Sequence, residues 1–485
     1  MSDTQELYAK RLRRYVTALN NRKPDMIPIR PFAAEFTGRH AGFDCQQVTQ
    51  DYNLGFEAMI RCCEDYDWDA VPANMIYVWP AITDAASARY YGVPGVNVPP
   101  DRGFQYLEPP EEQAFMKADE YDRFIDDPLA FLYEVWLPRA TRRIAAAGEP
   151  NTYRSDVALV SSAMAMTQYF NSYGPHCARL TEEAGTPGAI CGMFKAPLDV
   201  LGDKFRGYVG LSMDLFEQPA KVMKACEAMM PHLHWMAKSS ADPSSRAPLG
   251  YWMHRGGVPF VSHKHFDNIY WPTVRPVIED LWRDGHQTLF YAEGNWDEHL
   301  DAFRQLPERS IVYHIDRGNP QKIHDKLHGK FAISGGMSNV TLGTGTPAQV
   351  RGEVRKLIGI LGREGGYIMD ASAIMQNDTK PENMRAMVEA TREFGVYDSS
   401  DEPLADLCVR PFENGRGVSP KRPPAVSEKP HHPRPAGSCV PWDGHLRDLG
   451  LSRSAITGNP ELAERVWNAV DSNAASYIWQ MVLSF

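Results

Sequence analysis

The sequence predicts an α/β protein built on a (β/α)8 barrel, a ring of parallel strands surrounded by helices. Short apolar runs alternate with helical patterns, which gives about eight strand candidates counted from Ile27. Polar residues follow many of these runs where a strand would end. In a (β/α)8 barrel such strand ends form one catalytic face. An open doubly wound sheet is the alternative, although we find no G-x-G-x-x-G or Walker loop that would favour it.

The first part of the chain contains helical patterns separated by short apolar runs. Residues 4–20 have the periodicity of an amphipathic helix, and residues 26–32 are expected to form a short strand. A helix over 46–64 and a strand over 66–71 form the next unit. Residues 84–125 are rich in Pro, Gly and Tyr, which predicts a long insertion over the barrel mouth.

A more regular alternation follows the insertion. Helical patterns cover 127–147 and 156–186, and a Gly-Pro break places His176 in a turn. Strands are expected within the segments 191–201, 256–272, 288–291, 310–312, 330–342 and 365–375. Helices are expected within the segments 211–230, 273–285, 300–306, 345–362 and 381–395. Strands that alternate with helices in this way are typical of a parallel sheet.

Residues 288–316 contain a complete strand, helix and strand unit with candidate site residues. Glu293 directly follows the first strand, and His314 lies at the end of the second. Both are metal-ligand types, and neighbouring strand ends would bring them to one face. The alternative is that they cap loops or form hydrogen bonds there. The other strand-end candidates for catalysis are Tyr291, Asp316 and Asp370.

Polar residues that follow strands are also candidates for substrate binding. Arg30 lies near the end of the first strand segment, and Glu35 and Arg39 come shortly after it. Charges at this position are either pocket residues or solvated loop residues. Asn295, two residues after Glu293, is the fourth candidate.

Composition and charge exclude several classes of protein. The chain has 485 residues, with a net charge of −10, which argues against nucleic acid as a partner because phosphate binding needs a basic surface. No run reaches about 18 apolar residues, so no membrane span is expected. The first residues lack the apolar core of a signal peptide, and the eight cysteines form no C-x-x-C pair. We therefore expect reduced thiols and a cytoplasmic location.

Composition changes near residue 400 and divides the chain into three parts. Residues 1–400 form the expected barrel, and residues 401–439 form an extended arm rich in Pro, Lys and Arg. Residues 440–485 regain a helical pattern, and a helix after Pro460 is expected to dock on apolar surface. That surface belongs either to the same barrel or to a partner, which allows a homo-oligomer.

Several short motifs occur in a specific order between about residues 20 and 397. They are DMIPIRPF, YDWDAV, FKAPLDVL with LSMDLFEQP, LWRDGHQTLFYAEGN, NVTLGTGTPAQV, GGYIMDAS and DTKPENMRAMVEATREFG. Their order resembles the uroporphyrinogen decarboxylase superfamily, whose fold is a (β/α)8 barrel. The resemblance does not cover the tail.

The superfamily contains metal-free tetrapyrrole decarboxylases and cobalamin-linked methyltransferases, the latter usually with zinc on a His-x-Cys pair and a later Cys. Here Glu293 occupies the first Cys position and Ser372 the second, so that thiolate site is absent. The chain looks more similar to the methyltransferases of aryl-ether O-demethylation, which implies Glu and His as zinc ligands, at a spacing like Glu293 and His314. The further implied ligand is Glu279, with His265 and Asp267 as substitutes on the preceding strand end.

This resemblance implies transfer of a methyl group from a small O-methyl or N-methyl substrate to the cobalt of a corrinoid on a separate protein. Zinc would activate the leaving group, and Asp316 or Asp370 would orient His314. Without a metal, Tyr291, Glu293 and His314 would form an acid/base group. The alternatives are metal-free decarboxylation of a carboxylated substrate and a non-catalytic barrel subunit. Decarboxylation fits less well because Glu35 lies between Arg30 and Arg39.

Overall fold

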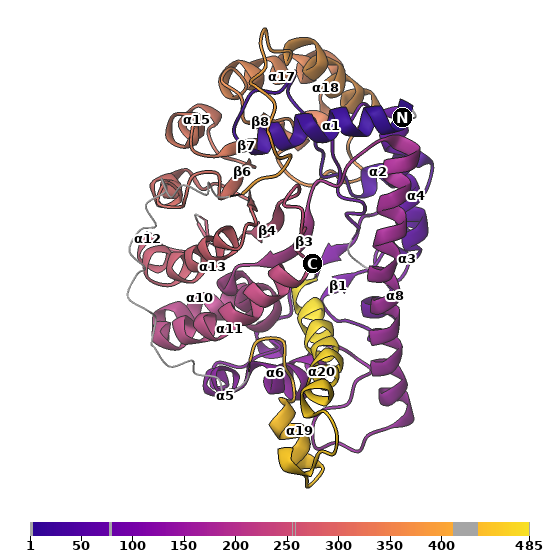
Figure 1. The fold of residues 1–485 in the computed structure, drawn as a ribbon, viewed down its shortest axis with the longest axis vertical. Helices are drawn as coiled ribbons and strands as arrows, with labels where there is room; N and C mark the ends of the chain where they lie inside the picture. Colours follow the sequence, from indigo (N-terminus) through magenta and orange to yellow (C-terminus); the bar gives the residue numbers. More distant parts are fainter. Residues whose placement is uncertain (1–2, 77–79, 255, 258, 411–434, 485) are drawn as a thin grey trace.

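The computed structural model describes residues 3–76, 80–254, 256–257, 259–410 and 435–484. Its centre is a sheet of six parallel strands in the order β3-β4-β5-β6-β7-β8 (Figure 1). The strands are β3 (Cys191–Lys195), β4 (Leu249–Met253), β5 (Thr288–Ala292), β6 (Ile311–Ile315), β7 (Ala332–Gly335) and β8 (Tyr367–Ile368). Sequential order with helices between the strands is the topology that the sequence predicts.

Two irregular segments complete the ring between β8 and β3. Ile29 forms a parallel bridge with Met369, just beyond β8, and its carbonyl accepts a hydrogen bond from the Asp69 amide at 2.8 Å. Val71 then forms a parallel bridge with Gly188, shortly before β3. Because these segments occupy the first two strand positions, the architecture is the predicted (β/α)8 barrel, which is confirmed.

Helices surround the strands and also lie beneath them. The helices that follow strands β3 to β8 are α9 (Pro197–Val200), α10 (Gly207–Glu217), α11 (Pro219–Ser239), α12 (His263–His265), α13 (Trp271–Arg283), α14 (Leu300–Phe303), α15 (Pro320–Leu327), α16 (Asn339–Thr344), α17 (Pro347–Leu361) and α18 (Pro381–Phe394). Helix α1 (Asp3–Leu19) lies at the amino-terminal ends of the strands, where the Leu19 carbonyl accepts a hydrogen bond from Gln287 at 3.0 Å. The opposite, carboxyl ends of the strands form the mouth.

The segment between the second strand position and β3 forms helices and a small hairpin. It contains β1 (Tyr91–Gly92), β2 (Gln105–Tyr106), α5 (Tyr121–Asp126), α6 (Pro128–Phe131), α7 (Leu137–Ala140) and α8 (Tyr153–Ala184), after α2 (Glu35–Ala41), α3 (Cys45–Gln50) and α4 (Tyr52–Asp65). The single helix expected over 127–147 is therefore wrong in extent, since the chain leaves helical geometry after Ala140.

Two sequence expectations in this half of the molecule need correction. Helix α8 runs through Pro175, and His176 stacks on Phe56 at 4.1 Å, so His176 does not lie in a turn. Pro175 has no amide hydrogen and so removes one helical hydrogen bond. Packing of α8 on α4 compensates for the stability lost with that bond. The strand expected within 256–272 is also misplaced, because β4 lies earlier, at the aromatic run Leu249–Met253.

Alternate residues along the strands belong to two different hydrophobic clusters. Leu289, Tyr291 and Val312 pack inside the barrel with α1, while Phe290 and Tyr313 pack beneath the outer helices. This alternation follows from the two-residue period of a strand. It directs odd-numbered β5 and even-numbered β6 side chains, including His314, into the barrel.

The carboxyl-terminal extension docks on the molecule through one half of its long helix. Helix α20 (Pro460–Leu483) lies near α8 (Figure 1), and α19 (Trp442–Asp448) precedes it. The sequence predicts docking of this helix through five apolar residues, Leu462, Val466, Val470, Ile478 and Trp479. Ile478 and Trp479 are fully buried, whereas Leu462, Val466 and Val470 are exposed, so the expected docking face is wrong in its first half. The Pro-rich arm expected over 401–439 lies mostly outside the described residues. None of the described helices combines the length and apolar character needed to cross a membrane.

Candidate functional site

The strand-end residues selected from sequence lie at the same end of the barrel. Glu293 follows β5, His314 is in β6, Asp316 follows β6, and Asp370 follows β8. The Glu293 side chain is 51% exposed at the mouth, whereas His314 and Asp370 are fully buried inside the barrel. Glu293 therefore lies at the solvent-exposed mouth, whereas His314 and Asp370 lie in the buried interior of the barrel.

His314 is held in a defined tautomer by neighbouring groups. Its Nε2 lies 3.1 Å from the Ser372 carbonyl, which only accepts, so Nε2 carries the proton. Nδ1 then accepts from the Ser334 hydroxyl at 3.0 Å. Burial, together with the charge of Arg30, lowers the pKa of His314 well below its ordinary value. His314 is therefore a neutral interior residue with both ring nitrogens engaged.

Arg30 and Asp370 form a fully buried ion pair beside His314. Arg30 Nη2 lies 3.1 Å from Asp370 Oδ2, and Asp370 Oδ1 accepts hydrogen bonds from the Phe32 and Ala371 amides. Burial raises the pKa of Asp370 to about 7, and the charge of Arg30 opposes that rise. Since arginine stays protonated, ionised Asp370 is its counter-charge. Arg30 thus belongs to the barrel interior, where it neutralises a carboxylate.

Aromatic rings lie beside these buried polar residues, at the same level of the barrel, because Trp252, Tyr291 and His314 are register partners on adjacent strands. The Tyr291 ring stacks on His314 with centroids 4.3 Å apart, and its other neighbour, Trp252, packs against it at 4.2 Å. Phe32 packs edge-on against both Trp252 and Tyr291. Tyr291 therefore lies beside His314 inside the barrel, as part of an aromatic group.

A chain of four alternating charges lies at the ends of β3, β4 and β5, and sequence reasoning identified only one of its members. Glu293 Oε2 lies 3.6 Å from His254 Nδ1, and His254 Nε2 lies 2.5 Å from Asp203 Oδ2. Asp203 in turn lies 3.1 Å from Lys195 Nζ. Lys195 ends β3 and His254 follows β4, the same strand-end position that Glu293 has after β5.

The two carboxylates keep the central imidazole charged. Burial alone would lower the pKa of His254, but Asp203 and Glu293 outweigh it and raise the pKa to about 10. His254 is therefore an imidazolium at neutral pH. Its Nε2–H points to the buried Asp203, and its Nδ1–H faces the exposed Glu293. The arrangement holds a transferable proton at the mouth of the barrel.

The loop that carries Glu293 is tied to the next strand end. Asp316 Oδ2 accepts a hydrogen bond from the Gly294 amide at 2.7 Å, and the Trp296 indole donates to the Glu293 carbonyl at 2.8 Å. Gly294 has φ of 88°, a conformation that glycine adopts without strain. Asp316 therefore fixes the position of the Glu293 backbone.

The four residues proposed as zinc ligands do not come together. Glu279 pairs with Arg275 within α13, at 2.7 Å, and His265 packs against the exposed ring of Phe216. His314 uses both ring nitrogens inside the barrel, as described above. In the described part of the chain, the group of three ligand-type side chains close enough to share a metal ion lies elsewhere, at His324, His328 and Glu364. The expected donor set thus does not fit a zinc ion at the mouth.

Of the other residues proposed for substrate binding, Arg39 and Asn295 have structural partners, and Glu35 is buried. Arg39 donates to the backbone carbonyls of Asn377, at 2.7 Å, and Thr379. Asn295 accepts a hydrogen bond from the Asp297 amide within its own loop. Glu35 is buried at the start of α2, and burial raises the pKa of its carboxyl to about 7. Glu35 is therefore a carboxyl group that titrates near neutrality.

Comparison with known proteins places this barrel in a family. Residues 145–394 match the uroporphyrinogen decarboxylase (URO-D) family, and the chain belongs to it. The uroporphyrinogen decarboxylase of Methylococcus capsulatus is 35% identical over 234 residues, which cover 46% of this chain and 65% of that protein. The match thus spans less than two thirds of that relative. A methyltransferase from Methanosarcina mazei has the same fold, with a TM-score of 0.52 and 14% identity, over 79% of this chain and 98% of that one.

Proposed function

We propose that this protein is a methyltransferase that takes a methyl group from an aryl methyl ether and passes it to the cobalt of a corrinoid held by a separate protein. The observation that carries this proposal is the imidazolium of His254 at the mouth, between Asp203 and Glu293. The shared fold with a methyltransferase agrees with it.

Departure of a phenoxide is the difficult part of this reaction. When the methyl–oxygen bond breaks, its electron pair stays on the ether oxygen, and a proton from His254 converts that oxygen to a phenol. A phenol has a pKa of about 10, as the tyrosine side chain shows. The pKa of His254 is also raised to about 10, so donor and acceptor are matched, which is the condition for effective general acid catalysis. A reduced corrinoid, when its carrier protein is bound, would supply the nucleophile for the methyl carbon.

Each neighbour of His254 has a role in this proposal. Asp203 holds the Nε2–H and keeps the ring oriented, while Lys195 compensates the charge of Asp203. Glu293 is the exposed partner, which returns a proton from water to His254 after each transfer. Asp316 positions Glu293 through the Gly294 amide.

The same site favours O-methyl over N-methyl donors. A quaternary amine leaves as a neutral amine, so it requires no proton when the carbon–nitrogen bond breaks. A donor histidine with an elevated pKa is useful only where the leaving group becomes an anion. Tyr291, His314 and Asp370, the catalytic candidates of the barrel interior, would then support the floor of the site.

Decarboxylation is the second candidate, because the 35% identical relative is a uroporphyrinogen decarboxylase. A substrate with several carboxylates needs cationic receptors. Arg30 is paired with Asp370 inside the barrel, and Arg39 donates to backbone carbonyls, so neither serves as a receptor in this structure. The engagement of both arginines therefore favours methyl transfer over decarboxylation.

A substrate panel tests the proposal. The purified full-length chain is incubated with reduced cobalamin and either a methoxybenzoate or a quaternary methylamine, and methylation is followed by absorbance. We expect methylation and phenol release with the methoxybenzoate. A chain that leaves methoxyarenes intact and decarboxylates uroporphyrinogen would contradict the proposal.

A further inference from the structure

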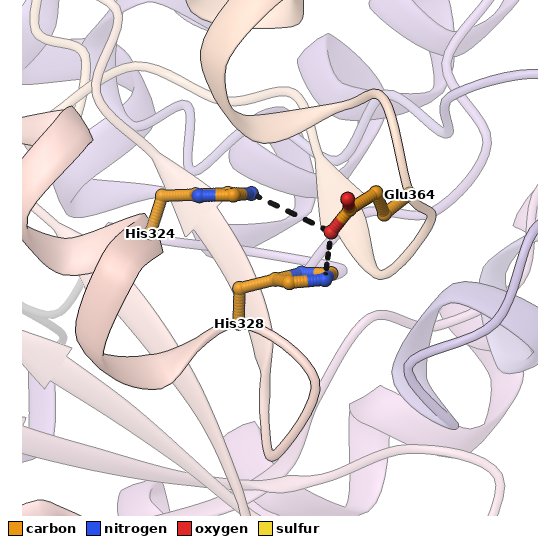
Figure 2. A group of neighbouring side chains, drawn as sticks. All are labelled: His324, His328 and Glu364. Carbon is orange, nitrogen blue, oxygen red and sulfur yellow. Dashed lines mark ion pairs between the residues drawn. The ribbon is translucent and has the colours of Figure 1, made fainter.

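A second group of ligand-type side chains lies on the outside of the barrel, away from the mouth. His324 is in α15 and His328 follows its last residue, so the two are one helical turn apart and face the same way. Their rings are parallel, with centroids 4.6 Å apart. Figure 2 shows both rings directed at Glu364, which lies between α17 and β8.

The three side chains are close enough to share one ion. Their ligand atoms all lie within 4.8 Å of one another. The Glu364 carboxylate makes a short contact with His328 Nε2 and lies 4.0 Å from His324 Nε2 (Figure 2). Neighbouring ligand atoms around a tetrahedral zinc ion are about 3.3 Å apart, given bonds of roughly 2.0 Å. The ligand atoms are therefore near the spacing that such a site requires.

An ion pair between His328 and Glu364 accounts for the positions of those two side chains. It does not supply a hydrogen-bond partner for His324. In the described part of the chain, neither ring nitrogen of His324 has a hydrogen-bond partner, although both are buried from solvent. Asp325 Oδ1 lies 3.6 Å from His324 Nδ1, where a carboxylate orients a ligand histidine. That contact leaves Nε2 of His324 facing Glu364.

The backbone around Glu364 is held in place. Gly365 and Gly366 follow it with φ of 95° and 69°, and a side chain at either position would collide with residues 21–23. The Gly366 amide donates to the Arg22 carbonyl at 3.1 Å, and its carbonyl accepts from the Ile333 amide at 2.8 Å. The carboxylate therefore sits on a turn of fixed conformation, which reduces the entropy lost when a metal binds.

We propose that His324, His328 and Glu364 form a binding site for a divalent transition-metal ion such as Zn²⁺. Two imidazoles and one carboxylate suit zinc, cobalt, nickel or copper better than calcium or magnesium. Because Glu364 is 58% exposed, water completes the coordination.

The site joins the helix that follows β6 to the turn that precedes β8. Both parts lie at the amino-terminal side of the barrel, which in this fold contributes to stability while chemistry occurs at the opposite face. The metal would act as a clamp on the strands that carry His314 and Asp370. This role is independent of the proposed methyl transfer.

Metal titration of the full-length protein tests the site. After treatment with a chelator and its removal, the protein is titrated with Co²⁺ and with Zn²⁺, following the Co²⁺ spectrum and the melting temperature. We expect one equivalent of Co²⁺ per chain and a higher melting temperature with Zn²⁺. His328→Ala and His324→Ala should each weaken binding by at least about tenfold and remove the thermal shift.

Two variants serve as matched controls. His40→Gln removes a histidine from another histidine–carboxylate pair, with Asp65 at 2.7 Å, and should bind Co²⁺ like the wild type. Glu293→Gln should also retain binding, which separates this site from the mouth. A wild-type chain that binds no Co²⁺, or binding that survives in both the His324 and His328 variants, would overturn the proposal. Because the Co²⁺ spectrum reports on the ligands directly, a variant that melts earlier still gives a decisive result.

Discussion

The Glu293 carboxylate lies 3.6 Å from Nδ1 of His254, and the two side chains follow adjacent parallel strands. The Glu293 carboxylate is half exposed, whereas the other ring nitrogen of His254, Nε2, is held by the buried Asp203. A proton on His254 is therefore stabilised by a buried charge and is accessible from the mouth. The predicted chemistry depends on this pair.

Replacement of Glu293 by Gln should slow methyl transfer and narrow its pH range. The variant keeps the shape of the side chain but removes one of two carboxylates that raise the pKa of His254. The protonated ring would then be lost at a lower pH than about 10, so the alkaline limb of the rate profile moves down. We expect a loss on the order of 100-fold at pH 8. A pH–rate profile that keeps its alkaline limb in the variant would exclude this role for Glu293.

The raised pKa of Glu35 predicts that the stability of the folded protein depends on pH. Its folded-state pKa, about 7, exceeds the ordinary value of 4.5, so the folded state holds more protons than the unfolded state between these values. Stability from this group is therefore present at low pH and falls as pH rises through that window. Glu35→Gln should match the wild type near pH 4.5 and be more stable by roughly 1–3 kcal/mol at pH 8. Urea midpoints at both pH values measure this, and equal midpoints at pH 8 would contradict it.

Much of the barrel was predictable from sequence because its strands are short apolar runs with polar residues directly after them. The rule selected Glu293 after β5 and Asp316 after β6. It applies equally to His254 after β4, but the sequence pattern predicts that strand within 256–272, whereas the structure has it at Leu249–Met253. His254 precedes the expected strand, so the rule does not select it.

Other features depend on tertiary contacts that no local pattern encodes. His314 and Asp370 have strand-end positions in sequence, yet the two-residue period turns both inward, where Arg30 and Ser334 meet them. Sequence spacing alone therefore pairs Glu293 with His314, whereas the structure pairs Glu293 with His254. The proposed metal site at His324, His328 and Glu364 could not be predicted from sequence either, because 36 positions separate Glu364 from His328.

The ion pair of Arg30 and Asp370 should show strong energetic coupling. Arg30→Met leaves a buried carboxylate without its cation, and Asp370→Asn leaves a buried guanidinium without its anion. Each single change should cost about 3–5 kcal/mol, while the double variant should cost less than the sum. Chemical unfolding of the four proteins measures the coupling. Strictly additive losses would show that the two groups do not compensate each other.

The carboxyl-terminal helix should stabilise the protein through its second half. Trp479 is fully buried, so Trp479→Ala should cost about 3–5 kcal/mol. Val466, on the same helix but 55% exposed, is a matched control, and Val466→Ala should change stability by less than about 0.5 kcal/mol. Truncation after residue 400 should expose the apolar surface beneath Trp479 and promote aggregation. A truncated chain that stays fully soluble would argue against docking.

The most direct test of the proposed chemistry compares two donors in one variant. His254→Gln removes the proton donor, and single-turnover methyl transfer is measured from a methoxybenzoate and from a nitro-substituted anisole, whose phenol is far more acidic. His286→Gln, at the opposite end of the barrel, is the control. We predict a loss on the order of 100- to 10,000-fold for the methoxybenzoate and less than about tenfold for the nitro compound, because the better leaving group needs no acid. Equal losses with both donors, or no loss with either, would contradict general acid catalysis by His254.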